Sequence, residues 1–216
     1  MKIKAVIFDM DGTMFDTEKT AIACWIQAAK IYGYQLENEW LEACIGQNLD
    51  RTIDILSGHV GELFPFSTVA ARADEMMVEK YRLYGIPMKE GLMDLLEILQ
   101  DLQLPLAVAT STHREKAEMM LQLAGVRQYF KVVVCGDEVE HSKPHPEIIE
   151  KACMGLDKNP SNCLVLEDSY AGVEAASTAG APVIFIPDAL APNDLVKDKA
   201  MKILPSLSTV AKLFKK

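Results

Sequence analysis

The sequence predicts an α/β protein with a doubly wound, mainly parallel, Rossmann-like sheet core and an inserted all-helical cap. Three observations predict this class. Short apolar runs rich in β-branched residues recur along the chain and end in polar residues, as buried parallel strands do. Segments with a helical spacing of apolar residues separate these runs. Between residues 16 and 86, one helical pattern follows another without strand-like alternation.

Length and composition limit the classes of protein to consider. Of the 216 residues, 50% are hydrophobic, so the chain can bury a full core. No apolar run approaches membrane-spanning length and the chain leads directly into a strand, so we expect neither a membrane partner nor a secretory signal. The formal charge of −9 disfavours a nucleic-acid partner, and an anionic substrate would need a metal ion and well-placed cations.

The cysteine pattern predicts a cytoplasmic protein. The chain has five cysteines, an odd number, and they lack Cys-x-x-Cys spacing. This pattern favours buried thiols in a reducing compartment over a disulfide framework or a zinc site. The positions are Cys24, Cys44, Cys135, Cys153 and Cys163.

The first expected strand, residues 4–8, delivers a carboxylate to the carboxyl edge of the sheet. This is the edge where open α/β sheets bind ligands. Asp9 and Asp11, followed by Gly12, can place the Asp9 carboxylate and the Asp11 backbone carbonyl on a hard cation such as Mg²⁺. The Asp11 carboxylate would then face the substrate. The alternative is an ordinary strand end with an Asp-Gly turn.

The helical stretch after this strand is predicted to be an inserted cap domain, residues 16–86, in a core formed by residues 1–15 and 87–216. A crossover between neighbouring strands is usually much shorter. A cap of this kind can close over a site and hold substrate selectivity. Asp16 or Thr17 is expected to cap the first helix, and further helical patterns cover residues 40–44, 48–57 and 68–84.

One stretch of the cap is a candidate for substrate binding. Gly46 is followed by two amides, Gln47 and Asn48, between helical patterns. These residues could present backbone and amide groups to a polar ligand. The alternative is a simple helix break with Asn48 as the N-cap.

The second core strand, residues 104–109, ends in three hydroxyl side chains. Thr110, Ser111 and Thr112 offer O–H and backbone N–H donors to phosphate oxygens. The alternative is that Ser111 or Thr112 caps the following helix, which carries Ala117 and Leu121. Both interpretations can hold together.

The third strand, residues 131–135, is followed by Lys143-Pro144-His145-Pro146. A lysine before proline is held extended, and its ammonium group can offset charge on a phosphoryl group and on an aspartate. Alone, the pattern is typical of a helix-entry turn. His141 and His145 have the spacing of a metal-binding pair, but hard-cation chemistry gives them no necessary role.

The fourth strand, residues 163–166, ends in two adjacent acids, Glu167 and Asp168. Acids at the end of a buried strand are costly to desolvate unless a positive charge compensates them, and a divalent cation is the natural candidate. The alternative is a pair of acids favoured by a helix N-terminus. Strands near residues 182–186 and 201–204, with helices between and after them, are expected to complete the sheet.

Taken in order, these four strand ends resemble the four motifs of the haloacid dehalogenase superfamily of phosphatases and mutases. The motif residues are Asp9 with Asp11, then Thr110, Lys143 and Asp168. The cap after the first motif, its entry at residues 15–17 and the pattern of residues 166–173 are similar to the branch of β-phosphoglucomutase and sugar-phosphate phosphatases. The second aspartate weighs against a true haloacid dehalogenase, which lacks it.

The resemblance implies a Mg²⁺-dependent phosphatase that acts on a small phosphorylated metabolite, such as a sugar phosphate. It implies that Asp9 is the nucleophile and Asp11 the general acid and base. Thr110, Ser111 and Lys143 would hold the phosphoryl group. Mg²⁺ would be coordinated by Asp9, the Asp11 carbonyl and Asp168, and Glu167 would support these ligands. Residues 46–48 would contact the substrate.

Two alternatives remain open from the sequence. A phosphohexomutase of this branch carries a cap histidine and a loop arginine, where this chain has Ala21 and Leu49, which favours the phosphatase. A non-catalytic phosphate-binding regulatory protein would have lost one of the motif acids or the lysine, and all are present. We expect a monomer or weak dimer without a nucleic-acid partner.

Overall fold

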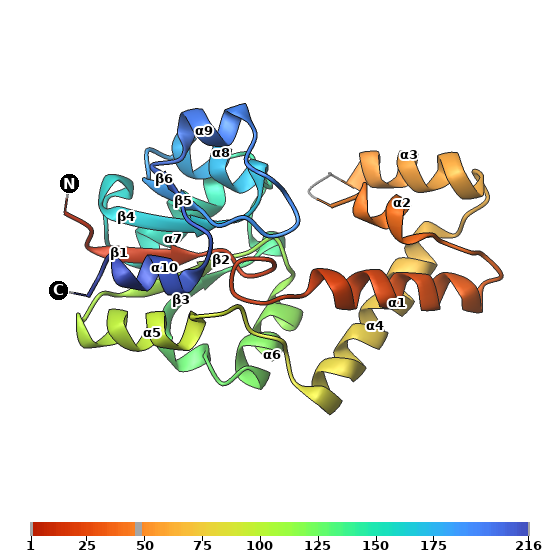
Figure 1. The fold of residues 1–216 in the computed structure, drawn as a ribbon, viewed down its shortest axis with the longest axis horizontal. Helices are drawn as coiled ribbons and strands as arrows, with labels where there is room; N and C mark the ends of the chain where they lie inside the picture. Colours follow the sequence, from red (N-terminus) through yellow and green to blue (C-terminus); the bar gives the residue numbers. More distant parts are fainter. Residues whose placement is uncertain (1, 46–48, 216) are drawn as a thin grey trace. The chain divides into compact units, whose positions relative to one another are not determined.

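A six-stranded sheet, in which all neighbouring strands are parallel, forms the centre of the larger of two units (Figure 1). The structure is a computed structural model and describes residues 2–45 and 49–215. The strand order β3-β2-β1-β4-β5-β6 confirms the predicted doubly wound α/β class. The strands are β1 Ala5–Phe8, β2 Leu106–Ala109, β3 Phe130–Val134, β4 Cys163–Glu167, β5 Val183–Phe185 and β6 Lys202–Ile203.

The four middle strands are buried along their whole length. Every residue of β1, β2, β4 and β5 is buried, whereas both residues of the edge strand β6 are exposed. Burial on both faces explains why these strands are continuous apolar runs rather than alternating patterns. Phe8 has Val108 as its register partner on one side and Leu166 on the other. The residues that follow β2, β1 and β4 therefore meet at one edge of the sheet.

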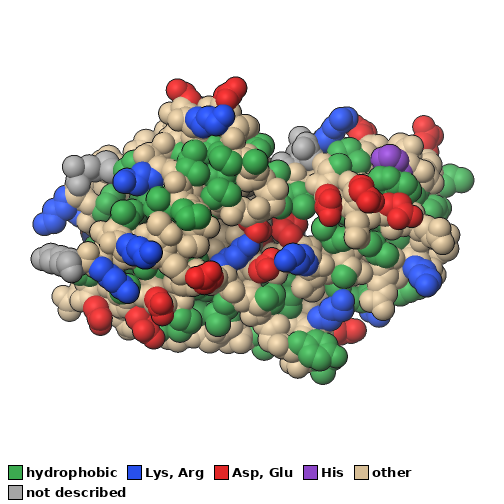
Figure 2. Space-filling view, in the orientation of Figure 1, with side chains coloured by type: hydrophobic (Ala, Val, Ile, Leu, Met, Phe, Trp, Pro, Cys, Tyr) green, Lys and Arg blue, Asp and Glu red, His purple; other side chains and the backbone are tan. Residues whose placement is uncertain are grey.

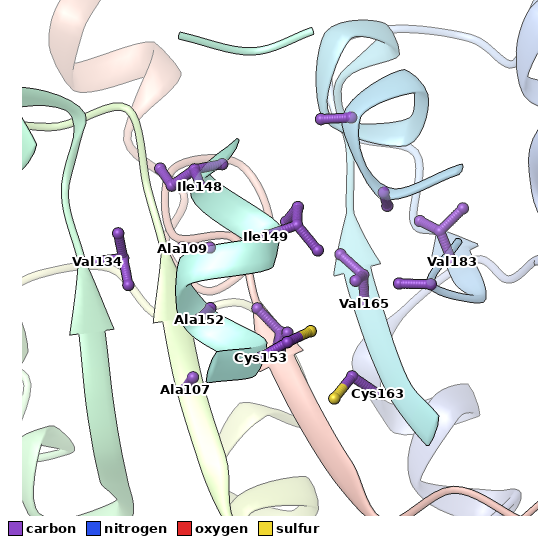
Figure 3. Close-up of a cluster of buried hydrophobic side chains, with 14 of the residues drawn as sticks. Ala107, Ala109, Val134, Ile148, Ile149, Ala152, Cys153, Cys163, Val165 and Val183 are labelled. Carbon is purple, nitrogen blue, oxygen red and sulfur yellow. The ribbon is translucent and has the colours of Figure 1, made fainter. Parts of the chain in front are cut away.

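Helices cover both faces of this sheet. Figure 1 shows α5 and α10, which pack on each other, on the near face and α7 on the far face. Ile148, Ile149 and Ala152 of α7 belong to a buried cluster with Ala107 and Val165 of the strands (Figure 3). The helices of this unit are α5 Leu92–Asp101, α6 Arg114–Leu123, α7 Glu147–Gly155, α8 Tyr170–Thr178, α9 Asp194–Lys199 and α10 Leu207–Lys212, with short 3-10 turns at Arg127–Tyr129, Gly136–Glu138 and Pro160–Asn162.

In the second unit, Thr17–Gly85, the described residues form helices joined by turns and irregular segments, without strands. Its longest helices, α1 and α4, pack on each other and bury Ala28 and Ala73. The Trp25 ring lies 5.2 Å from the Phe66 ring, and the Trp40 ring stacks on His59 at 4.3 Å. The helices are α1 Glu18–Ile31, α2 Asn38–Glu42, α3 Leu49–Val60 and α4 Phe66–Tyr84.

The two units meet in sequence at a pair of connecting segments. The larger unit comprises Met1–Asp16 and Ile86–Lys216, whereas the sequence places the changes after residues 15 and 86. Within the larger unit the two segments pair: the Asp16 N–H donates to the Pro87 carbonyl at 2.8 Å, and Phe15 bridges to Met88. The chain therefore leaves and re-enters the larger unit through adjacent segments.

The structure confirms the position of one predicted helix cap and contradicts the other. Thr17 is the N-cap residue of α1, but its side chain makes no capping hydrogen bond. The N-cap of α6 is His113, so neither Ser111 nor Thr112 caps that helix. Instead, the Arg114 N–H donates to the Asp137 carboxylate at 2.9 Å. A side chain 23 positions away in the sequence thus accepts a hydrogen bond from a free backbone N–H group at the start of α6.

The distribution of surface charge, the hydropathy of the helices and the state of the cysteines can each be compared with the sequence predictions. Acidic and basic side chains are interspersed over the face shown in Figure 2. Within residues 2–45 and 49–215, no helix has both the length and the apolar character that a membrane crossing requires. All five cysteines are free, and four of them are buried.

Candidate active site

The carboxyl ends of β1, β2 and β4 place polar side chains next to one another. Asp9 follows β1, and its N–H donates to the Leu166 carbonyl of β4 at 2.9 Å. Glu167 is the last residue of β4 and is fully buried. Thr110 follows β2 and is 1% exposed. Three predicted site residues therefore share this edge because the register of the sheet aligns the strand ends.

Lys143 reaches this edge from the loop between β3 and α7. Its Nζ lies 2.6 Å from Asp9 Oδ1 and 2.7 Å from Glu167 Oε1. The Lys143 side chain is only 6% exposed. The Lys143–Pro144 peptide bond is cis, a feature that the sequence did not predict. The ammonium group thus joins the acids that follow β1 and β4.

Glu167 is held by two backbone N–H groups in addition to Lys143. Its Oε2 accepts hydrogen bonds from the backbone N–H groups of Asp168 at 2.7 Å and Ser169 at 2.6 Å. A Cβ at Gly172 would lie 1.6 Å from Glu167 Oε1, so only glycine leaves room for this carboxylate. With one oxygen on Lys143 and the other on two N–H groups, the Glu167 carboxylate orients Lys143 and the segment that contains Asp168.

The Asp168 carboxylate is positioned by two residues of the segment after β1, Gly12 and Thr13. The Thr13 hydroxyl donates to Asp168 Oδ1 at 2.7 Å. Gly12 has φ of +80°, and a Cβ there would lie 2.1 Å from Asp168 Oδ2. Gly12 therefore serves both the left-handed turn and the close approach of Asp168. Sequence reasoning missed Thr13, although its place beside Gly12 in the motif was a signal.

Asp11 is contacted by Thr112, from the segment after β2. The Thr112 hydroxyl donates to Asp11 Oδ2 at 2.8 Å. The Thr112 N–H in turn donates to the Thr110 hydroxyl oxygen at 3.1 Å. Sequence reasoning considered Thr112 as a phosphate donor or a helix cap and missed this contact. The parallel pairing of β1 with β2, which brings the two segments together, was the signal that could have found it.

The remaining predicted site residues are Ser111 and the three residues of the cap stretch. Ser111 is exposed, and its backbone carbonyl approaches Gly136 so closely that a Cβ there would lie 2.2 Å from it. Gly46, Gln47 and Asn48 lie outside the described residues. Their predicted role in substrate binding stays a prediction.

Burial and mutual repulsion shift the pKa values of these acids upward. Burial raises the pKa of Asp9 to about 8, with Lys143 opposing the shift and the charges of Glu167 and Asp11 adding to it. Burial also raises the pKa of Asp168 well above its ordinary value, and Glu167 and Asp9 add to the effect. Although burial alone would lower the pKa of Lys143, the charges of Asp9 and Glu167 raise it. One ammonium group is therefore too little positive charge for these carboxylates.

The donor set fits a divalent cation. One carboxylate oxygen each of Asp9, Glu167 and Asp168 lies within 4.8 Å of the others. If all three are ionised, the single ammonium of Lys143 leaves this group with a net charge of −2. Buried charge of this kind is costly unless a cation or protons neutralise it. A hard divalent cation such as Mg²⁺ matches both the charge and the oxygen donors.

The helical unit contains a pocket of its own. It has a volume of about 240 Å³ and lies among α1, α2 and α3. Polar and apolar side chains share its wall, so it suits a ligand of mixed character. Its lining residues are Glu18, Ala21, Ile22, Trp25, Leu41, Cys44, Ile45, Thr52 and Leu56.

Comparison with known proteins gives a family match over most of the chain. The profile of the family described as haloacid dehalogenase-like hydrolase matches residues 6–186. A phosphorylated carbohydrates phosphatase from Thermotoga maritima is 33% identical over 185 residues, which are 85% of this chain and 84% of that protein. The pyrophosphatase PpaX from Bacillus mycoides is 30% identical over 97% of this chain and 99% of its own length.

A solved structure shows the same fold with ligands. The structure of CbbY from Rhodobacter sphaeroides in complex with phosphate has a TM-score of 0.83 and 26% identity, covering 96% of each chain. A mutant of CbbY, solved in complex with xylulose-1,5-bisphosphate, matches with a TM-score of 0.82 and 25% identity over 95% of each chain. These relatives thus include a protein that has been solved with phosphate and, as a mutant, with a sugar bisphosphate.

Proposed function

Since the chain belongs to the haloacid dehalogenase-like hydrolase family and is a phosphatase of that type, we propose that it hydrolyses a small sugar phosphate with Mg²⁺ and a phosphoaspartate on Asp9. The observation that carries the proposal is the meeting of Asp9, Lys143 and Asp168 where β1 and β4 end. A nucleophile, a fixed cation and an oxygen-rich metal site are what phosphoryl transfer through an aspartate requires.

Asp9 attacks first in the proposed mechanism. One of its carboxylate oxygens bonds to phosphorus, in line with the bond to the alcohol oxygen, and that bond breaks. Asp11 gives a proton to the departing alcohol oxygen. Thr112 positions Asp11 through the hydrogen bond of 2.8 Å. The products of this step are the free alcohol and phosphoaspartate.

Water completes the cycle. Asp11, now a carboxylate, removes a proton from a water molecule whose oxygen attacks phosphorus. The bond between phosphorus and the Asp9 oxygen breaks, which releases inorganic phosphate and restores the Asp9 carboxylate. Asp11 thus acts as the acid in the first step and the base in the second, and it regains in the second step the proton that it lost in the first.

The phosphoryl oxygens need positive charge and hydrogen-bond donors throughout. Lys143 supplies a fixed ammonium group beside Asp9, and Thr110 supplies a hydroxyl group at the neighbouring strand end. Asp9, Asp168 and the Asp11 carbonyl would hold Mg²⁺, with Glu167 orienting Lys143 and Asp168. When bound, Mg²⁺ neutralises the carboxylates and the transferring phosphoryl group.

Two observations support a sugar phosphate as the substrate. Relatives that match across most of the chain include a phosphatase of phosphorylated carbohydrates and a protein solved with xylulose-1,5-bisphosphate. The pocket of the helical unit combines polar and apolar lining, which suits the hydroxyl groups and ring faces of a sugar. Pyrophosphate, suggested by the name of another relative, is the competing substrate class.

Replacing the nucleophile tests the mechanism. Asp9→Asn keeps the shape of the side chain but cannot attack, so turnover should fall at least about a thousandfold while the fold persists. The measurement is phosphate release from a panel of sugar phosphates and pyrophosphate, with Mg²⁺ and with excess chelator. Asp198→Asn, an exposed acid on α9, is the control and should keep full activity. Undiminished hydrolysis by Asp9→Asn, or full activity in chelator, would contradict the proposal.

A further inference from the structure

The loop between β3 and α7 and the first residue of α7 bring together a second group of side chains of types that can bind metal ions, which the proposed mechanism does not use. One ring nitrogen each of His141 and His145 and one carboxylate oxygen of Glu147 lie within 4.8 Å of one another. The two imidazole centroids are 4.5 Å apart, with 32° between the ring planes. His141 Nδ1 lies 3.3 Å from Glu147 Oε2. These three residues thus already form a cluster.

The backbone of the loop fixes the carboxylate in this cluster. Glu147 Oε1 accepts the Glu140 N–H, and Glu147 Oε2 accepts the His141 N–H, both at 3.0 Å. The Glu147 N–H donates to His145 Nδ1 at 3.3 Å. A hydrogen bond from Lys151, followed by the one from the Glu140 N–H, lowers the pKa of Glu147 to about 2. The two backbone N–H groups therefore hold both oxygens of the Glu147 carboxylate in place beside the His141 ring.

We propose that His141, His145 and Glu147 bind a borderline divalent cation, Zn²⁺ or Ni²⁺, on the surface of this loop. Two imidazoles with one carboxylate suit such ions, whereas Mg²⁺ prefers oxygen donors alone. Tetrahedral zinc with bonds of about 2.0–2.1 Å needs donor atoms roughly 3.3 Å apart. His141 Nδ1 and Glu147 Oε2 have that separation without movement.

The histidine side chains can complete the site by rotation. Both histidines are exposed, and the His141 side chain is 60% exposed, so the rings can turn toward an ion and water can fill a remaining position. The ion would replace the contact between the His141 ring and Glu147, and it would take His145 from its weak contact with the Glu147 N–H. The site is therefore distinct in donors and in metal preference from the carboxylates at the strand ends.

Calorimetric titration of the full chain with Zn²⁺ tests the proposal. Saturating Mg²⁺ is present so that the oxygen-rich site is occupied by its preferred ion. One equivalent of Zn²⁺ should bind, and His141→Ala or His145→Ala should each weaken binding at least about tenfold. The matched control is His113→Ala, because His113 is exposed but belongs to another loop, and its affinity should be unchanged.

Titration with Co²⁺ gives a spectroscopic readout of the donors. Nitrogen and oxygen ligation gives weak visible bands, whereas thiolate ligation adds an intense charge-transfer band in the near ultraviolet. The weak bands should disappear in the double variant of His141 and His145 and persist in Asp168→Asn, which alters only the proposed Mg²⁺ site. Circular dichroism confirms that each variant is folded.

Several outcomes would contradict the proposed metal site. These are the absence of Zn²⁺ uptake by the wild type, unchanged affinity in the double variant, or an equal loss in His113→Ala. A thiolate band with Co²⁺, or loss of Zn²⁺ affinity in Asp168→Asn, would also count against it. Loss of phosphatase activity in Asp9→Asn bears on the proposed function alone, so the two proposals fail independently.

Discussion

At the scale of single residues, Gly12 determines where Asp168 can lie. A Cβ on Gly12 would lie 2.1 Å from Asp168 Oδ2, at a backbone φ of +80°. Gly12→Ala should therefore displace the Asp168 carboxylate from the position that Thr13 supports, and it should weaken Mg²⁺ activation by about 10–100-fold. The measurement is phosphatase activity as a function of Mg²⁺ concentration.

A variant of a second glycine, Gly180, serves as a control that distinguishes the steric clash with Asp168 from backbone strain. Gly180 has φ of +75°, but a Cβ there would meet nothing within 4 Å. Gly180→Ala should thus cost about 1 kcal/mol of unfolding free energy and leave Mg²⁺ activation unchanged. If both variants lost Mg²⁺ affinity equally, the close approach of Asp168 to Gly12 would not be the cause.

Thr112 is expected to be a positioning residue for Asp11. Thr112→Val removes the hydroxyl that donates to Asp11 Oδ2 at 2.8 Å while keeping the shape of the side chain. Because Asp11 is the general acid and base of the proposed mechanism, kcat should fall about ten- to hundredfold, with little change in KM and an altered pH profile. Thr112→Ser should restore activity. An unchanged pH profile in Thr112→Val, or failure of the serine variant to rescue, would exclude this role.

At the scale of elements, an ion-pair network ties α6 to the 3-10 turn that follows it. Glu118 on α6 accepts hydrogen bonds from Arg114 at 2.9 Å and Arg127 at 2.7 Å. Burial alone would raise the pKa of Glu118, but Arg127 and Arg114 outweigh it and hold that pKa below its ordinary value. This stabilisation is complete above the unfolded-state pKa of about 4.3, and it is lost as pH falls through the folded-state pKa.

Glu118→Gln should therefore give a pH-dependent loss of stability. The expected loss of unfolding free energy is about 1 kcal/mol at neutral pH, because the partners are partly exposed, and it should shrink on acidification. Urea denaturation at a series of pH values measures it. The control is Glu115→Gln, an exposed acid on the same helix, which should show no such trend. A deficit that is the same at every pH would contradict the ionic origin.

The elements themselves could be predicted from the sequence because their signals are local. The buried strands are short apolar runs, and the helices around Trp25 and Leu121 follow from the spacing of their apolar residues. The cap of α6 could not be predicted in the same way. A local rule selects Ser111 or Thr112, but tertiary structure satisfies the helix with Asp137, which is distant in sequence.

The same distinction applies to the candidate site. The sequence predicted that Asp9 and Asp168 share a strand edge, because residues at the ends of parallel strands converge. It placed Lys143 there only through the resemblance to the superfamily's third motif. It did not predict that Thr13 holds Asp168 or that Thr112 holds Asp11. Those contacts join different loops, and they depend on turn geometry that only the three-dimensional structure supplies.

At the scale of the whole molecule, the two units differ in the chemistry they offer. The larger unit holds the buried acids, Lys143 and the hydroxyl groups at the strand ends, all of which contact the phosphoryl group rather than the sugar in the proposed mechanism. The helical unit offers a separate pocket with Glu18 and Trp25 among its lining residues. We infer that the reaction type belongs to the larger unit and that selectivity for the alcohol belongs to the helical unit.

This division predicts which of two reactions the protein performs. A mutase must keep water from its phosphoaspartate until the sugar has turned over in a closed site. Mutases of the similar branch place histidine and arginine where this chain has Ala21 and Leu49. Without those groups to couple closure to sugar binding, Asp11 should act on water, so sugar phosphates should yield inorganic phosphate.

The measurement follows both products during incubation with β-glucose 1-phosphate, Mg²⁺ and a trace of the bisphosphate. Phosphate release from several sugar phosphates is the expected result, because the phosphoaspartate then reacts with water faster than with a second sugar hydroxyl group. Efficient formation of glucose 6-phosphate with negligible phosphate release would instead identify a mutase. Release from a nucleoside monophosphate, with no reaction on any sugar phosphate, would keep the chemistry of Asp9 and Asp11 and change only the alcohol that the helical unit selects.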